Sequence, residues 1–219
     1  MNTTPLTKAI TLHQPWASLI ALGHKSIETR PSPPNGPMCP AGVRGYPGLA
    51  IERGERLAIH AGAQRPYTDD YEDGHDFGTL YRGPDAAWSF QWMKPVGKRG
   101  WHYYVNGEEP HDLPLGAIVA TAVVADALPM VDPFAHPGPD PWDGRDRIFV
   151  GSRDGLLRTN PRGGPPLNID RETDLGDYRP GRWGWLLSDV QRCEPVPCKG
   201  RQGVWALPVE ASQAVTPHG

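Results

Sequence analysis

The chain has 219 residues, of which 26 are glycine and 26 are proline, so these two types make up about a quarter of it. Disordered chains approach this content, but they lack the eight tryptophans and seven tyrosines found here and usually carry more net charge than −3. The absence of a Gly-x-y period excludes collagen, and the composition excludes a coiled coil. We therefore expect a compact, loop-rich globular protein with one domain.

Compartment and partner class follow from the same counts. No stretch approaches about eighteen consecutive apolar residues, and the first residues lack the regions of a signal peptide, so we expect a cytoplasmic protein that does not enter a membrane. Three cysteines are too few for a disulfide framework. Residues 1–61 and 182–208 carry net charges of +3 and +2 on an otherwise acidic chain, which is compatible with a phosphate-bearing partner.

The chain opens with a predicted strand and a predicted helix. Residues 8–12 (KAITL) alternate and contain β-branched types, which is typical of a strand. Pro15 suits the first helical position, and Gly23 suits a left-handed cap after the helix end. The apolar positions at helical spacing predict a buried stripe of Trp16, Leu19 and Ile20.

The segment after the helix carries the first chemical lead. Residues 26–30 (SIETR) predict a strand with Ser26, Glu28 and Arg30 on one face. Lys25 follows the capped helix, so we expect its ammonium to emerge beside that face. Lys25 and Arg30 could bind a phosphate while Glu28 accepts hydrogen bonds from a base edge. The alternative is an ordinary surface ion pair among these three residues, which the spacing alone favours.

Further strands are predicted in the middle and at the end of the chain. Residues 56–61 (RLAIHA) predict a strand, and residues 116–128 predict a central strand buried on both faces. The chain then closes on a strand, a turn and a strand over 182–187, 189–200 and 202–209.

The rest of the chain is expected to be insertions and a tail. Pro/Gly-rich or aperiodic sequence predicts insertions at about 31–48, 62–114 and 129–181, with one short regular piece near 147–152. Residues 209–219 are a predicted polar tail.

Several other residues have both a functional and a structural interpretation. His60 could act as a base in a cleft or be a hydrogen-bonded wall residue, and His13 and Gln14 could contact a ligand or cap the helix. Trp183 and Trp185 share a strand face, so they could stack a base or be buried, with burial expected for at least one. Trp205 is expected in the core.

Two stretches of biased composition are candidate binding sites. Residues 88–104 mix aromatic and basic side chains, which suits single-stranded nucleic acid. The favoured interpretation is a satellite hydrophobic cluster with solvated lysines, and a protein-binding surface is a third. The acidic run 69–76 does not have the spacing of a calcium loop. Cys193-x4-Cys198 on a predicted hairpin, with only Cys39 to join it, does not indicate a metal site, and we expect no metal or cofactor.

Four segments carry a resemblance to a known family: LHQPWASLIALGHKSIETR (12–30), LAIHAG (57–62), LGAIVATAVV (115–124) and GRWGWLLSDVQRCEPVPCKGRQGVWALP (181–208). Together they resemble the activating signal cointegrator homology (ASCH) domain of the PUA-like superfold. Their order is similar to the family's QPW helix, Gly-x-Lys-x-x-Glu-x-Arg segment, middle strands and closing Trp-bearing strand. The resemblance covers somewhat over a third of the chain.

The resemblance implies an α+β, mainly-β fold: a PUA-like β-barrel with flanking short helices, here as one domain over 1–208 with the insertions. It implies an RNA- or nucleotide-binding cleft, with His13, Gln14, Lys25, Glu28, Arg30 and Trp183 as candidate ligand contacts. A second hypothesis is a hydrolase of modified nucleosides or RNA, either an amidohydrolase or a nuclease, that uses Lys25, Glu28 and His60. Against it, Glu28 stands where related amidohydrolases have a threonine nucleophile. A third is an adaptor that binds a protein through 62–114.

Overall fold

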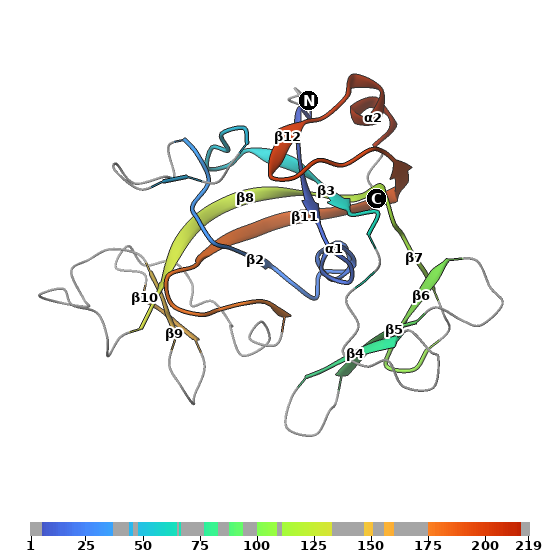
Figure 1. Cartoon of the computed structure of the whole chain (residues 1–219), viewed down its shortest axis with the longest axis horizontal. Coiled ribbons are helices and arrows are strands. Elements are labelled where there is room, and N and C mark those ends of the chain that lie inside the picture. Colours follow the sequence, from blue (N-terminus) through green and yellow to red (C-terminus); the bar gives the residue numbers. More distant parts are fainter. Residues whose placement is uncertain are drawn as a thin grey trace, which may run out of the picture. The chain divides into compact units, whose positions relative to one another are not determined.

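The structure is a computed structural model in which residues 6–36, 44–45, 48–64, 66, 77–82, 88–93, 100–108, 111–132, 147–150, 156–159 and 175–215 are described. The protein is mainly β, as expected, with a mixed half-barrel sheet, a smaller antiparallel sheet and two very short helices (Figure 1). Within the described residues no helix is long and apolar enough to cross a bilayer. Neither the acidic run 69–76 nor Cys39 belongs to the described residues.

Twelve strands and two helices make up the regular structure of the described residues. The strands are β1 (Lys8–Leu12), β2 (Ile27–Arg30), β3 (Arg56–Ala61), β4 (Phe77–Arg82), β5 (Trp88–Met93), β6 (Trp101–Val105), β7 (His111–Leu113), β8 (Ala117–Val131), β9 (Arg147–Val150), β10 (Leu156–Thr159), β11 (Trp183–Pro197) and β12 (Val204–Ala206), and the helices are α1 (Trp16–Ala21) and α2 (Val209–Ala214). The predicted strands at 8–12 and 56–61, the helix after Pro15 and the buried strand from 116 are confirmed.

The strands pair in two sheets. The main sheet has the order β10-β9-β8-β3-β1-β12, and β11 pairs with both β8 and β2. The β1–β3 and β8–β9 pairs are parallel, whereas β1–β12, β2–β11 and β9–β10 are antiparallel. The chain divides into two compact units. Unit 1 comprises Met1–His24, Leu57–Thr121 and Val190–Gly219, and unit 2 comprises Lys25–Arg56 and Ala122–Asp189.

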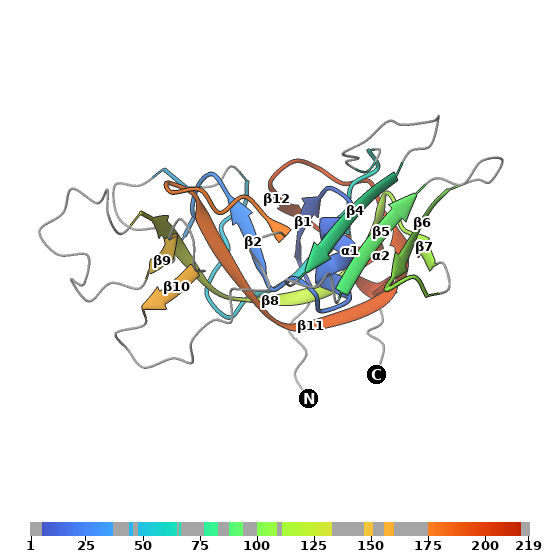
Figure 2. The ribbon, with the colours of Figure 1, turned by 90° about the horizontal axis from the view of Figure 1, so that it is seen from below.

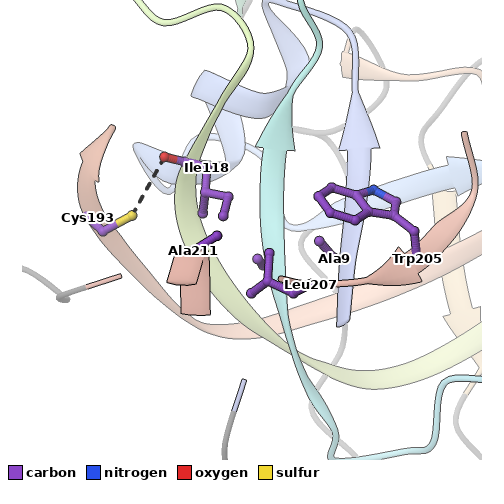
Figure 3. Close-up of a cluster of buried hydrophobic side chains, with 7 residues drawn as sticks. Ala9, Ile118, Cys193, Trp205, Leu207 and Ala211 are labelled. Atoms are coloured by element: carbon purple, nitrogen blue, oxygen red, sulfur yellow. Dashed lines mark hydrogen bonds between the residues drawn. The ribbon is translucent and has the colours of Figure 1, made fainter. Parts of the chain in front are cut away.

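The core of unit 1 forms where β1, β3, β8, β11 and β12 contribute apolar side chains. Its buried cluster is Ala9, Ala58, Ile118, Cys193, Trp205, Leu207 and Ala211 (Figure 3). Ala211 belongs to α2, so part of the predicted polar tail is a helix with one buried residue. The expectation that Trp205 lies in the core is confirmed.

Helix α1 is followed by a left-handed glycine, as the sequence predicts. Gly23 has a φ of +74°, and its N–H donates to the Ile20 carbonyl, so the left-handed residue closes the last turn. Leu19 and Ile20 are fully buried. Trp16 is only half-buried, which corrects its expected place in the buried stripe.

A four-stranded antiparallel sheet, in the order β4-β5-β6-β7, occupies part of the predicted insertion 62–114 (Figure 2). Its buried aromatic side chains are Phe90, Trp92, Trp101 and Tyr103. The Phe90 and Tyr103 rings stack with centroids 5.2 Å apart. These four side chains therefore form the satellite hydrophobic cluster and not an exposed aromatic surface.

Unit 2 has a core of its own. Its buried cluster is Ile27, Leu128, Met130, Ile148, Tyr178 and Leu186. Gly184 lies against this cluster so closely that a Cβ there would stand 2.6 Å from Ile148 Cδ1. The short regular piece expected near 147–152 is confirmed as β9.

The predicted strand, turn and strand after residue 182 is wrong in one respect. Residues 183–197 form one continuous strand, β11, which includes residues 189–197 of the predicted turn. Asp189 has a φ of +45°, and both its carbonyl and its carboxylate accept hydrogen bonds from Arg56. This local irregularity explains the turn-like sequence without a reversal of the chain.

Candidate functional site

The predicted site residues are divided between the two units. His13, Gln14 and His60 belong to unit 1, whereas Lys25, Glu28, Arg30 and Trp183 belong to unit 2.

Glu28 and Arg30 form the centre of the unit 2 group. Their side chains project from the same face of β2, as the alternation predicts, and Arg30 Nε lies 2.9 Å from Glu28 Oε1. Both side chains are largely buried, with exposed fractions of 15% for Arg30 and 12% for Glu28. The ion pair that the sequence offers as the alternative to a ligand site is therefore formed between Glu28 and Arg30, and it is more sheltered than an ordinary surface pair.

Two tryptophans lie directly across from this ion pair. In the antiparallel β2–β11 register Trp183 pairs with Arg30, and Trp185 pairs with Glu28. Directly opposed residues of antiparallel strands share a face of the sheet, so all four side chains lie on one face. Trp185 is buried and Trp183 is half-buried, so the expectation of at least one buried tryptophan is confirmed.

Lys25 does not emerge at the surface, which corrects the expectation from its position after the capped helix. The residue is 1% exposed. Its ammonium donates to the Ile27 carbonyl and lies 6.0 Å from the centroid of the Tyr178 ring. Burying a charged amine is unfavourable unless hydrogen bonds and ring contacts such as these compensate. Lys25 thus holds strand β2 from within and offers no open phosphate contact.

The outer edge of β2 is held by a segment that sequence reasoning did not single out. Thr29 accepts a hydrogen bond at Oγ1 from the Asp177 N–H (3.2 Å) and one at its carbonyl from Arg182 Nη2 (3.3 Å). Asp177 also binds Arg179 through both carboxylate oxygens, at 2.8 and 2.7 Å. The sequence contains a signal for this segment, because two arginines, Arg179 and Arg182, come just before Trp183. The predicted insertion 129–181 ends between them, so the pair was not recognised as part of the site.

Gln14 is a structural residue of unit 1. It is fully buried, and its Nε2 donates to Ser18 Oγ at 2.8 Å and to the Pro114 carbonyl at 2.7 Å. Its Oε1 accepts the Ser18 N–H at 3.1 Å, so the side chain caps the first turn of α1. His13 is exposed, and its carbonyl accepts the Ala17 N–H at 3.3 Å. Helix capping, one of the two interpretations, therefore accounts for Gln14.

His60 is also part of a packed wall. It is 1% exposed, its Nε2 lies 2.9 Å from the Cys198 carbonyl, and its ring meets Trp205 edge-on at 5.7 Å. Since a carbonyl only accepts, Nε2 carries the proton in the neutral ring. Nδ1 has no hydrogen-bond partner among the described residues. Burial lowers the pKa of His60 from its ordinary value, although the hydrogen bond to Cys198 opposes this shift.

This environment predicts acid sensitivity. Because the folded state lowers the His60 pKa below 6.5, the unfolded chain binds the proton more readily, and stability falls as the pH drops below about 6.5. His60→Gln keeps a donor for the Cys198 carbonyl but does not titrate. Urea unfolding at several pH values measures this effect. Between neutral pH and pH 5 the free energy of unfolding should fall more steeply for the wild type than for the variant. Parallel curves would contradict this role of His60.

The remaining cysteines are not arranged for metal binding in the described part of the chain. Burial raises the pKa of Cys193 to about 11 and also raises that of Cys198, so both thiols stay protonated at neutral pH. No group of three potential ligands among His, Cys, Asp and Glu occurs within the described residues.

A small cavity in unit 1 lies beside α1. It is lined among others by Ser18, Tyr103, Asp112, Arg192 and Cys193, and its volume of about 20 Å³ leaves room for about one water molecule. This volume is too small to hold a nucleobase. No protein-family model matches the chain, and no curated protein matches it.

Proposed function

We propose that the protein is an ASCH-type, PUA-like barrel that binds single-stranded RNA or its nucleotides on the face of β2 and β11 in unit 2. Arg30 contacts a phosphate, Glu28 accepts hydrogen bonds from a base edge, and a base stacks on Trp183. The family, the complete barrel and its single-domain organisation over 1–208 belong to the same proposal.

The observation that carries the proposal is the register of β2 and β11. It places a guanidinium, a carboxylate and a half-buried indole on one face of two neighbouring strands. Nucleic-acid binding sites for single strands combine these features: a cation for the backbone and an aromatic ring on which any base can stack. Because Glu28 and Arg30 are paired and sheltered, their positions are set before a ligand arrives, which reduces the ordering cost of binding.

The other two hypotheses draw less support from the described geometry. A hydrolase would need Lys25 to stabilise a developing charge, but its ammonium is buried at the Ile27 carbonyl. His60 would need an accessible nitrogen, but its ring is buried and packed against Gly200. An adaptor would need exposed aromatic side chains in 88–104, and the four that form the sheet core are buried.

The proposal predicts a specific loss of RNA binding in Trp183→Ala. Stacking on an aromatic ring contributes about 1–3 kcal/mol per base, so the affinity for a short single-stranded RNA should fall about ten- to a hundredfold. Arg30→Gln should remove one phosphate contact, so the slope of log affinity against log salt concentration should become shallower by about one. Fluorescence anisotropy with a labelled oligonucleotide at several salt concentrations measures both quantities.

Trp16→Ala is the matched control, because it removes another half-buried tryptophan, on α1 in unit 1. Its RNA affinity should equal that of the wild type. The proposal fails if the wild type has no measurable affinity at low salt, or if Trp183→Ala and Arg30→Gln both bind as the wild type does.

A further inference from the structure

The segment that holds the outer edge of β2 contains an unusual set of charges. Arg179 and Arg182 both approach the carboxylate of Asp177, which Arg179 engages through two parallel hydrogen bonds and Arg182 through Nη1 at 3.3 Å. The two guanidinium groups hold the pKa of Asp177 at about 2, well below its ordinary value. Two cations thus converge on one anion.

The carboxylate does not satisfy both arginines. Nε of Arg182 is buried and has no hydrogen-bond partner among the described residues, while its Nη2 is taken by the Thr29 carbonyl. Both carboxylate oxygens of Asp177 accept hydrogen bonds from Arg179, and Arg182 approaches one of them only through Nη1, so its Nε is left without an acceptor in the described part of the chain. A phosphate has more oxygens and more negative charge than a carboxylate. It can therefore accept hydrogen bonds from Arg179 and one more from Nε of Arg182.

We propose that Arg179 and Arg182 form a phosphate subsite, and that Asp177 occupies it as an internal anion until a phosphate displaces it. This inference rests on the proposed function, because it assigns the phosphate to the nucleotide whose base stacks on Trp183, the residue next to Arg182. Access is available from solvent, since the side chain of Arg179 is 81% exposed and that of Arg182 is 24% exposed. The bound phosphate comes from a nucleotide or from the RNA backbone and not from the free ion.

Binding of uridine, 5′-UMP and inorganic phosphate to the full chain, measured calorimetrically at low salt, tests the subsite. The wild type should bind 5′-UMP more tightly than uridine, and Arg179→Gln and Arg182→Gln should each lower the 5′-UMP affinity about tenfold while leaving that of uridine unchanged. Asp177→Asn removes the internal anion without changing the backbone donor to Thr29, so it should bind 5′-UMP more tightly than the wild type.

Asp126→Asn is the matched control, because Asp126 belongs to the same unit and forms an ion pair with an arginine outside the proposed subsite, Arg53. It should leave all three affinities unchanged. The inference is overturned if Arg179→Gln, which changes a side chain that is 81% exposed, folds and binds 5′-UMP as the wild type does. It is also overturned if a folded Asp177→Asn binds no more tightly.

The three ligands separate this inference from the proposed function. Binding of uridine that is lost in Trp183→Ala, with no gain from the phosphate group, would overturn the subsite and leave the base site standing. Binding of 5′-UMP and inorganic phosphate with equal affinity, both dependent on Arg179, would overturn the base site and the assignment of the phosphate to a nucleotide.

Discussion

Replacing Trp185 by alanine should lower the free energy of unfolding by about 3–5 kcal/mol, the usual cost of removing a large buried aromatic side chain. Trp185 is 1% exposed, and it pairs with Glu28 across the β2–β11 register. The indole therefore lies beside a largely buried ion pair and helps to keep water from it. Its loss removes apolar contacts and also lets solvent weaken the Glu28–Arg30 interaction.

The matched comparison is Trp183→Ala, two residues away on the same face of the same strand. Trp183 is half-buried, so its removal should cost clearly less stability than that of Trp185, while it costs the RNA affinity described above. Urea unfolding of both variants, followed by circular dichroism, measures the difference. If the free energy of unfolding of Trp185→Ala lies within about 1 kcal/mol of the wild-type value, the surrounding side chains can close the cavity and the buried indole is not essential for stability.

Replacing Gly200 by alanine should cost about 3 kcal/mol, at the upper end of the range for overpacking a core. A Cβ at this position would stand 2.3 Å from His60 Cε1 and 2.8 Å from Thr11 Oγ1. Neither neighbour can retreat easily, because His60 is bound to the Cys198 carbonyl and Thr11 accepts a hydrogen bond from Trp205 Nε1 at 3.1 Å. The methyl group must therefore displace the 198–200 segment.

Two comparisons isolate this contact. Gly184→Ala places its Cβ 2.6 Å from Ile148 Cδ1, the flexible end of a side chain, so its loss of stability should be smaller. In a double-mutant cycle, Gly200→Ala should cost much less in a His60→Ala background, where the ring is absent. Thermal and urea unfolding measure both. Equal costs in the two backgrounds would exclude the His60 ring as the cause.

The elements with strong local patterns could be predicted from the sequence. The strand at 8–12 alternates, the helix after Pro15 carries its own glycine cap, and the apolar run from 116 is long enough to be read as buried strand. The common face of Glu28 and Arg30 followed from the two-residue period of a strand. These features depend on the order of neighbouring residues, which the sequence contains directly.

Other local signals were misleading or too weak. The polar residues near Asp189 imitate a turn, but Asp189 adopts a positive φ inside one continuous strand. The small sheet of β4 to β7 was missed because its short strands have no sustained period, and each is stabilised by pairing with the others. Its aromatic side chains look like a binding surface until that pairing shows them to be a core.

The site depended most on tertiary structure. The residue types around Lys25, Glu28 and Arg30, and their spacing along one strand, were determined by the sequence alone. The burial of Lys25, the place of Trp183 opposite Arg30, and the approach of Asp177 and Arg182 to Thr29 were decided only by the fold. The physical reason is that strand register and burial arise from contacts between segments some 150 residues apart, and no local pattern specifies those contacts.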